Sequence, residues 1–207
     1  MAENEVVIRA EALQLEGLLE SVTGDSGVVV THPHPQYGGD MHNNVVDAIV
    51  KAYRKNGYST LRFNFRGVGA SRGAFDNGIG EREDVRAAIA YLSGLGKKNI
   101  DLAGYSFGAW VNALGLETFE HVSRMIMVSP PVGLLDFDPV VSDSKIKLVI
   151  AGSRDDIAMV GAIEKKMPAW NPEAVLRVIQ DADHFYWGKT DEIETIIDEF
   201  LREKTLL

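Results

Sequence analysis

The serines of two short glycine motifs are the first side chains in this sequence that could do chemistry. The pattern Gly-x-Ser-x-Gly occurs at residues 69–73, as GASRG, and at residues 104–108, as GYSFG. Ser106 directly follows an apolar, strand-like run and precedes a helical pattern, so it would lie on a sharp strand-to-helix turn at a helix N-terminus. Ser71 is followed by a glycine-rich loop with no helical period. The context therefore predicts Ser106 as a nucleophile and Ser71 as a loop hydroxyl.

A serine hydroxyl becomes a good nucleophile when an imidazole takes its proton and a carboxylate holds that imidazole. His121 and His184 are the histidines that follow Ser106 in the chain. His184 comes directly after the strand-like run AVLRVIQ, at the expected carboxyl edge of a sheet, and is the predicted base. His121 precedes a strand-like run, and we expect it at the surface.

The carboxylate partner is expected after the strand-like run IKLVIAG. Asp155 stands three residues after Gly152, and Asp156 follows it. Asp155 is the predicted acid, whereas Asp156 is better explained as a carboxylate near a helix N-terminus, where the helix dipole favours negative charge. Asp181 and Asp183, which are close to the predicted base in the sequence, are weaker candidates.

An acyl-transfer site also needs two N–H groups for the oxyanion that forms in the transition state. The residue after the nucleophile, Phe107, supplies the first. The second is expected from the loop THPHPQYGG, where Pro33 and Pro35 have no N–H to donate. His34 lies between these prolines and is the predicted donor, in a loop that the prolines hold stiff.

A metal site made by His32, His34 and His42 is the alternative explanation of the same loop. The ligand spacing of a zinc site, and the acidic residues that would hold its histidines in place, are not evident, so we expect neither a metal nor a cofactor. The sequence contains no cysteine, which excludes disulfides, thiolate ligands and a cysteine nucleophile.

The elements that must position these residues alternate along the chain. Short β-branched runs, several of them apolar throughout, suit strands buried in a parallel sheet. Helical spacing of apolar residues separates several of them, around residues 46–53, 85–92 and 193–201. The first two runs, VVIRA and LQLEGLLES, have no helix between them and should pair antiparallel. The pattern predicts a doubly wound α/β sheet with its ligand site at the carboxyl ends of the strands.

Length and charge limit the remaining possibilities. A chain of 207 residues fits one α/β domain, residues 1–207. The formal net charge of −9, without a basic cluster, disfavours nucleic acid and anionic membrane surfaces as partners. The acidic N-terminus has no signal-like apolar run, and no apolar stretch is long enough to cross a membrane, so we expect a cytoplasmic monomer or homodimer.

Several segments together resemble the α/β-hydrolase superfamily, and within it the small lidless bacterial hydrolases similar to dienelactone hydrolase. They are THPHPQYGGDMHNNVV, LRFNFRGVGASRG, LAGYSFGAW, GSRDD and ADHF. The resemblance implies a three-layer fold, with a mostly parallel central sheet, helices on both faces and no cap domain. It also implies a triad of Ser106, Asp155 and His184, with His34 and Phe107 as oxyanion donors. Dienelactone hydrolase has a cysteine in place of Ser106, so its substrate is not carried over.

The connection between SPPVG and IKLVIAG is short, which predicts an open site. We expect an aromatic wall around this site, with Tyr37 and Phe185 binding substrate. Its candidates are Tyr37, Phe107, Trp110, Phe185, Tyr186 and Trp187, although Trp110 suits the core better.

The sequence thus predicts a carboxylesterase-like serine hydrolase that acts on ester or thioester bonds of small acyl substrates through an acyl-enzyme on Ser106. A peptidase or an acyltransferase with the same triad is the enzymatic alternative. A non-catalytic protein that binds a ligand in the open pocket is the alternative from a different class.

Overall fold

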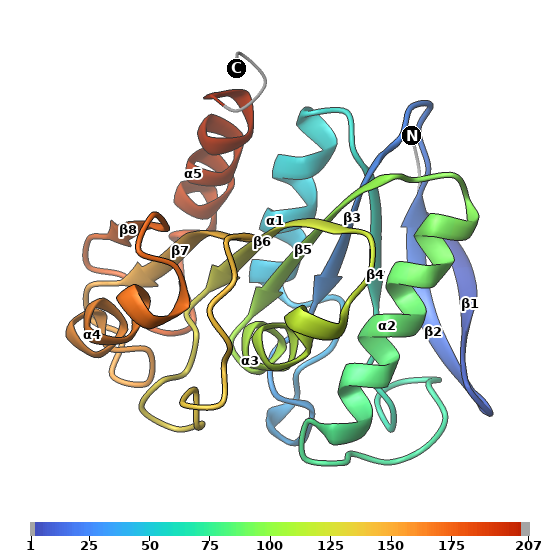
Figure 1. Ribbon diagram of the computed structural model, residues 1–207, viewed down its shortest axis with the longest axis horizontal. Coiled ribbons are helices and arrows are strands. Elements are labelled where there is room, and N and C mark those ends of the chain that lie inside the picture. Colours follow the sequence, from blue (N-terminus) through green and yellow to red (C-terminus); the bar gives the residue numbers. More distant parts are fainter. Residues whose placement is uncertain (1–2, 204–207) are drawn as a thin grey trace.

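The computed structural model describes residues 3–203, which form an eight-stranded sheet flanked by helices (Figure 1). The strands are β1 (Asn4–Ala10), β2 (Leu13–Glu20), β3 (Ser26–Thr31), β4 (Ser59–Phe63), β5 (Asn99–Tyr105), β6 (Val122–Val128), β7 (Ile146–Gly152) and β8 (Val175–Ile179). The helices are α1 (Asn44–Lys55), α2 (Ile79–Gly94), α3 (Phe107–Gly115), α4 (Val160–Trp170) and α5 (Thr190–Glu203), with 3₁₀ turns η1 (Pro35–Tyr37) and η2 (Leu116–Thr118).

The strands lie in the order β1-β2-β4-β3-β5-β6-β7-β8. β1 pairs antiparallel with β2, as the sequence predicted, and β2 pairs antiparallel with β4. Every neighbouring pair from β4 to β8 is parallel. The inner strands are buried on both faces, which explains why their sequences are apolar throughout.

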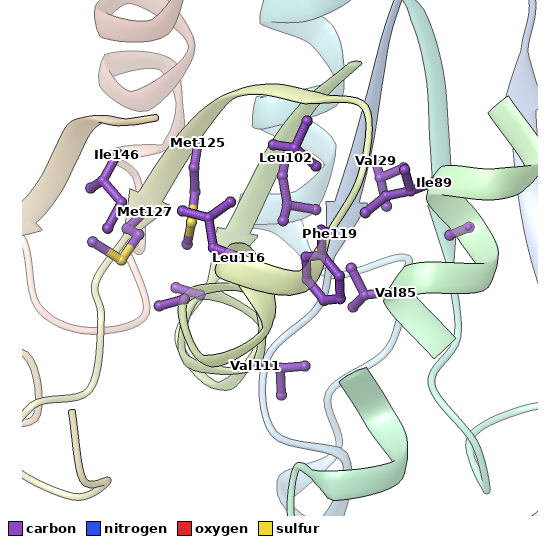
Figure 2. Packing of buried hydrophobic residues seen from close by; sticks show 14 of the residues in the cluster. Val29, Val85, Ile89, Leu102, Val111, Leu116, Phe119, Met125, Met127 and Ile146 are labelled. Carbon is purple, nitrogen blue, oxygen red and sulfur yellow. The ribbon is translucent and has the colours of Figure 1, made fainter. Parts of the chain in front are cut away.

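Helices cover both faces of the sheet, so the molecule has three layers (Figure 1). α1 and α5 pack on one face, where Ile49 and Tyr53 share a buried cluster with Ile193 and Ile197. α2, α3 and α4 pack on the other face. Figure 2 shows part of that second cluster, with Leu102 of the sheet near other buried apolar side chains. The predicted three-layer α/β fold is confirmed.

A helix was expected after Asp156, but no helical spacing of apolar residues marked the bounds of α4. Only Ile163, Met167 and Trp170 of its residues are buried, and Pro168 lies inside it. A weak apolar period and a proline that cannot donate a backbone hydrogen bond together hide the helix from pattern analysis.

The topology brings four loops to one edge of the sheet. β3 lies between β4 and β5. The chain passes from β3 to β4 on one side and later returns to form β5 on the other side. At such a switch point the loops beyond the carboxyl ends of the strands separate and leave a crevice. The loops after β3, β5, β7 and β8 carry His34, Ser106, Asp155 and His184 respectively.

Candidate active site

Ser106 forms the turn between β5 and α3. Its backbone angles, φ 52° and ψ −117°, lie in a region that residues with a side chain rarely adopt. Its N–H donates to the Val128 carbonyl at 2.9 Å, and its carbonyl accepts from the Trp110 N–H at 3.2 Å. The turn is thus fixed on both sides. The residue is 7% exposed and lines a pocket.

The two glycines of the motif permit this turn to pack closely. A Cβ on Gly104 would lie 2.6 Å from the backbone nitrogen of Ala109, and a Cβ on Gly108 would lie 2.7 Å from the carbonyl oxygen of Thr31. Because both contacts are far shorter than van der Waals distance, a larger residue would push the start of α3 away from β3 and β5. The glycines therefore bring the N–H of Phe107 close to the loop after β3.

His184 links Ser106 to Asp155. The Oγ of Ser106 lies 2.9 Å from Nε2 of His184, and Nδ1 of His184 lies 2.8 Å from Oδ2 of Asp155. All three residues are buried. With its proton on Nδ1 and donated to the carboxylate, the imidazole has Nε2 free to accept the serine proton. The structure thus brings together the serine, histidine and aspartate that the sequence singled out.

Asp155 is held by more than the histidine. Its Oδ1 accepts from the N–H groups of Ile157 at 3.0 Å and Ala158 at 2.7 Å, and its Oδ2 accepts from the Ser129 hydroxyl at 2.7 Å. Burial acts to raise the pKa of Asp155. The hydrogen bond and the charge of His184, together with the hydrogen bonds from Ala158 and Ser129, outweigh burial and lower the pKa. The carboxylate is therefore ionised at neutral pH.

Ser129, at the end of β6, is a site residue that the sequence analysis missed. Its φ is +45°, and its Oγ lies 2.6 Å from the Tyr186 hydroxyl as well as contacting the carboxylate. The Tyr105 hydroxyl donates to the His184 carbonyl at 2.6 Å. Burial raises the pKa of both tyrosines, so both remain protonated donors. The signal for Ser129 was its place directly after a strand, at the same edge as the other site residues.

The loop after β3 forms a tight turn beside the serine. The His34 carbonyl accepts from the N–H groups of Tyr37 at 3.1 Å and Gly39 at 3.0 Å. The rings of His34 and Phe107 lie 4.8 Å apart, and both residues line the pocket. The Phe107 N–H is at the start of α3, where the first N–H groups have no acceptor within the helix.

His32 braces this loop from behind. Its Nε2 accepts from the Phe65 N–H at 3.0 Å, so its Nδ1 donates to the Pro33 carbonyl at 2.7 Å. Burial lowers the pKa of His32 to about 4, which keeps the ring neutral. Because both nitrogens are engaged, His32 is not free to bind a metal with His34 and His42. Within residues 3–203 no three histidine or acidic side chains are grouped to hold a metal.

A pocket of about 490 Å³ opens beside Ser106. Tyr37 and Phe185, the residues predicted to bind substrate, both line it and are 79% and 55% exposed. The chain segments after β6 and β7 add an aliphatic wall to the pocket.

Comparison with known proteins places this arrangement in a family. No protein-family model matches the chain. The uncharacterised protein RP471 of Rickettsia prowazekii is 32% identical over 201 residues, covering 91% of this chain and 84% of that protein. The structure of an α/β serine hydrolase homologue from Coxiella burnetii has a TM-score of 0.89 at 30% identity, covering 97% of this chain and 98% of its own. XC6422 from Xanthomonas campestris, an α/β serine hydrolase without a lid, also has a TM-score of 0.89, at 29% identity over 98% of this chain and 95% of its own.

The chain belongs to the α/β-hydrolase superfamily. It is a small member of the kind that lacks a lid, as its resemblance implied. The segment between β6 and β7, where a cap would be inserted, contains only turns and extended chain. The protein is therefore a hydrolase with an uncovered site. In the described part of the chain, no helix has both the length and the apolar character needed to span a membrane.

The aromatic wall expected around the hydrolase site is only partly formed. Tyr186 is fully buried, because its backbone, with φ +55°, turns the side chain inward to Ser129. Trp110 donates from Nε1 to the Asp136 carbonyl at 2.7 Å and packs against the core. Trp187 is 77% exposed. Trp110 thus lies against the core, as the sequence favoured, whereas Tyr186 and Trp187 do not line the pocket and their proposed place in the wall is wrong.

The competing serine and histidine lie outside the site. Ser71 donates to the Asn64 carbonyl at 2.6 Å and accepts from the Glu16 N–H at 2.9 Å, so its buried hydroxyl holds a loop against β2. His121 is exposed, as expected.

The competing aspartates do not contact the histidine ring. Asp156 is exposed and lies three residues before Met159, the N-cap of α4. It is therefore outside the helix N-terminus, and the expectation that it stabilises a helix N-terminus is wrong. Asp183 accepts from backbone N–H groups of its own loop, and Asp181 pairs with Arg154 at the surface.

Proposed function

We propose that this α/β-hydrolase cleaves carboxylic esters of small or accessible acyl substrates through an acyl-enzyme on Ser106. The observation that carries the proposal is the continuous hydrogen-bonded chain from Ser106 through His184 to Asp155, opening on a pocket of about 490 Å³. A loop serine that only caps a helix would need neither the buried imidazole nor the ionised carboxylate behind it.

In the first step, the Oγ of Ser106 attacks the ester carbonyl carbon while Nε2 of His184 takes the hydroxyl proton. The carbonyl oxygen becomes an oxyanion, which the N–H groups of Phe107 and His34 stabilise. Asp155, ionised because its pKa is lowered, stabilises the imidazolium that forms. The imidazolium then protonates the leaving alcohol, the carbon–oxygen bond breaks, and the acyl group remains on Ser106.

In the second step, water replaces the alcohol. His184 takes a proton from the water as its oxygen attacks the acyl carbon, and the same two N–H groups stabilise the second oxyanion. The imidazolium returns the proton to Ser106 Oγ as the acyl–serine bond breaks. The carboxylic acid leaves, and each residue is back in its starting state.

A peptidase is less well supported than an esterase. Extended peptides bind by adding a strand to an exposed sheet edge. Here the edges are β1 and β8, whereas Ser106 follows β5 in the interior of the sheet. The pocket thus offers side-chain walls for a compact substrate and no strand edge for a peptide.

The test is hydrolysis of p-nitrophenyl hexanoate by the wild type and two serine variants. Ser106→Ala should lower kcat by at least about a thousandfold, since the nucleophile of the acyl-enzyme is gone. Ser71→Ala, which removes the serine of the competing motif, should keep kcat within about threefold for the folded protein. Full activity in Ser106→Ala would refute the proposal. Added peptides and alcohol acceptors in the same assay would detect the peptidase and acyltransferase alternatives.

A further inference from the structure

The pocket beside Ser106 has no charged wall. Among the described residues that line it there is no lysine, arginine, aspartate or glutamate. One side is aliphatic and consists of Pro131, Leu134 and Leu135 from the segment after β6, and Ile157 from the segment after β7. A carboxylate or phosphate placed against this wall would lose water and gain no cation in exchange, which is strongly unfavourable.

The histidines of the pocket do not supply a permanent cation either. Burial lowers the pKa of His34, so its ring is neutral at neutral pH. His184 is already engaged between Ser106 and Asp155, and any charge that it gains in the reaction is matched by that carboxylate. An anionic substrate would therefore find no countercharge.

The residues just outside the pocket add negative charge. Asp40, Asp136, Asp156 and Asp183 are each next in the chain to a lining residue, whereas no lysine or arginine is. Backbone N–H groups hold the carboxylates of Asp40, Asp136 and Asp183 in place. These carboxylates belong to a chain with a formal net charge of −9, whose overall field disfavours the approach of an anion.

We infer that the site selects electroneutral esters and rejects substrates that carry an anionic group close to the scissile bond. This inference rests on the proposed function and narrows its substrate class. It excludes esters and lactones that carry a carboxylate near the reacting carbonyl. Leu134, which is 58% exposed and lines the pocket, keeps this wall apolar and is therefore a specificity-determining residue.

The first experiment compares two esters with the same leaving group. p-Nitrophenyl hexanoate ends its acyl chain in a methyl group, and mono-p-nitrophenyl adipate ends a chain of equal length in a carboxylate. At low ionic strength, kcat/KM for the hexanoate should exceed that for the adipate by about 100-fold, given the cost of desolvating an unpaired carboxylate. Raising the ionic strength to about 0.5 M should narrow the ratio, because salt screens exposed aspartates. A low-salt ratio within about threefold would overturn the inference.

A charge-introducing variant tests the location of the selectivity. Leu134→Arg should raise kcat/KM for the adipate relative to the hexanoate by about tenfold, since it adds a cation to the wall. The matched control is Leu95→Arg. Leu95 is 47% exposed at the end of α2, before β5 begins and therefore away from the carboxyl edge, and its replacement should leave the ratio unchanged. An unchanged ratio in Leu134→Arg would refute the role of Leu134.

Failure of the inference can be told apart from failure of the proposed function. Equal hydrolysis of both esters that disappears in Ser106→Ala would contradict the inference alone. Absence of Ser106-dependent hydrolysis of the neutral ester would contradict the proposed function and the inference with it.

Discussion

Ser129 is one of the groups that hold the carboxylate of Asp155. Oδ1 of Asp155 accepts from two backbone N–H groups, Oδ2 accepts from the Ser129 hydroxyl, and Nδ1 of His184 lies within 3.0 Å of both oxygens. The Tyr186 hydroxyl in turn lies 2.6 Å from Ser129 Oγ. The backbone of Ser129 is held at φ +45°, a conformation that is costly and is retained only where surrounding structure requires it. Ser129 is thus a positioning residue that acts through Asp155.

Replacing Ser129 by alanine should therefore slow the proposed reaction without weakening substrate binding. Ser129→Ala should lower kcat for p-nitrophenyl hexanoate about tenfold with KM unchanged. The variant lacks the hydrogen bond from Ser129 to the Asp155 carboxylate, which is needed most in the transition state, when His184 becomes charged. The control is Ser142→Ala, which removes a serine hydrogen bond to the Trp170 carbonyl far from the pocket. A kcat for Ser129→Ala within twofold of the wild type would show that the hydroxyl does not position Asp155.

At this scale the sequence predicted part of the site. Ser106, His184 and Asp155 each follow an apolar strand, and that place in the pattern singled them out before their contacts were known. Whether they catalyse the reaction stays a prediction. Ser129 follows a strand in the same way, but a hydroxyl that acts through another residue has no motif of its own. The inward turn of Tyr186 depends on a positive φ that no sequence pattern announced.

Among the elements, the junction of β5 and α3 sets the geometry of the nucleophile. The start of α3 packs so closely on the sheet that a methyl group at Gly104 has no room. This packing keeps the first N–H of α3 near the loop after β3, where the two proposed oxyanion donors must converge.

Gly104→Ala should therefore destabilise the protein by about 3 kcal/mol, because its Cβ would meet backbone of α3 that cannot move independently of the helix. Gly94→Ala is the matched control. Gly94 is in α2 with nothing within 4 Å of a Cβ, so this change should stabilise by about 0.5–1 kcal/mol. Urea denaturation of both variants measures the difference, and equal effects would refute the packing argument.

Most of the strands and helices were predicted from the sequence. The apolar runs predicted the strands, and helical spacing predicted α1, α2 and α5. α4 shows no clear helical spacing, because Pro168 and a sparse apolar face obscure it. Residues 129–145 have no regular structure, so no periodic pattern could show which of their side chains line the pocket.

For the whole molecule, the free energy of unfolding should depend on pH through His32, a buried residue that also holds the loop after β3 in the site. The ring is buried in neutral form between the loop after β3 and the end of β4. Its pKa in the folded protein is about 4, below the usual value of 6.5. The unfolded chain therefore binds a proton more readily, so stability from this group is present above pH 6.5 and is lost as the pH falls toward 4.

The free energy of unfolding should accordingly fall by about 2 kcal/mol between pH 7 and pH 5 on account of His32 alone. His32→Gln should lack this part of the decrease, whatever its stability at pH 7. His121→Gln, which replaces an exposed histidine, should keep the pH dependence of the wild type. Urea denaturation at the two pH values measures all three proteins. Identical pH dependence in His32→Gln and the wild type would contradict the assignment.

Covalent labelling would show whether Ser106 is an activated nucleophile. The wild type, Ser106→Ala, His184→Ala and Ser71→Ala would be treated with a fluorophosphonate probe, and the modified residue located by peptide mass spectrometry. We expect one label on Ser106, lost in Ser106→Ala and His184→Ala and kept in Ser71→Ala. A folded wild type that takes no label, or a label that persists in Ser106→Ala, would contradict it.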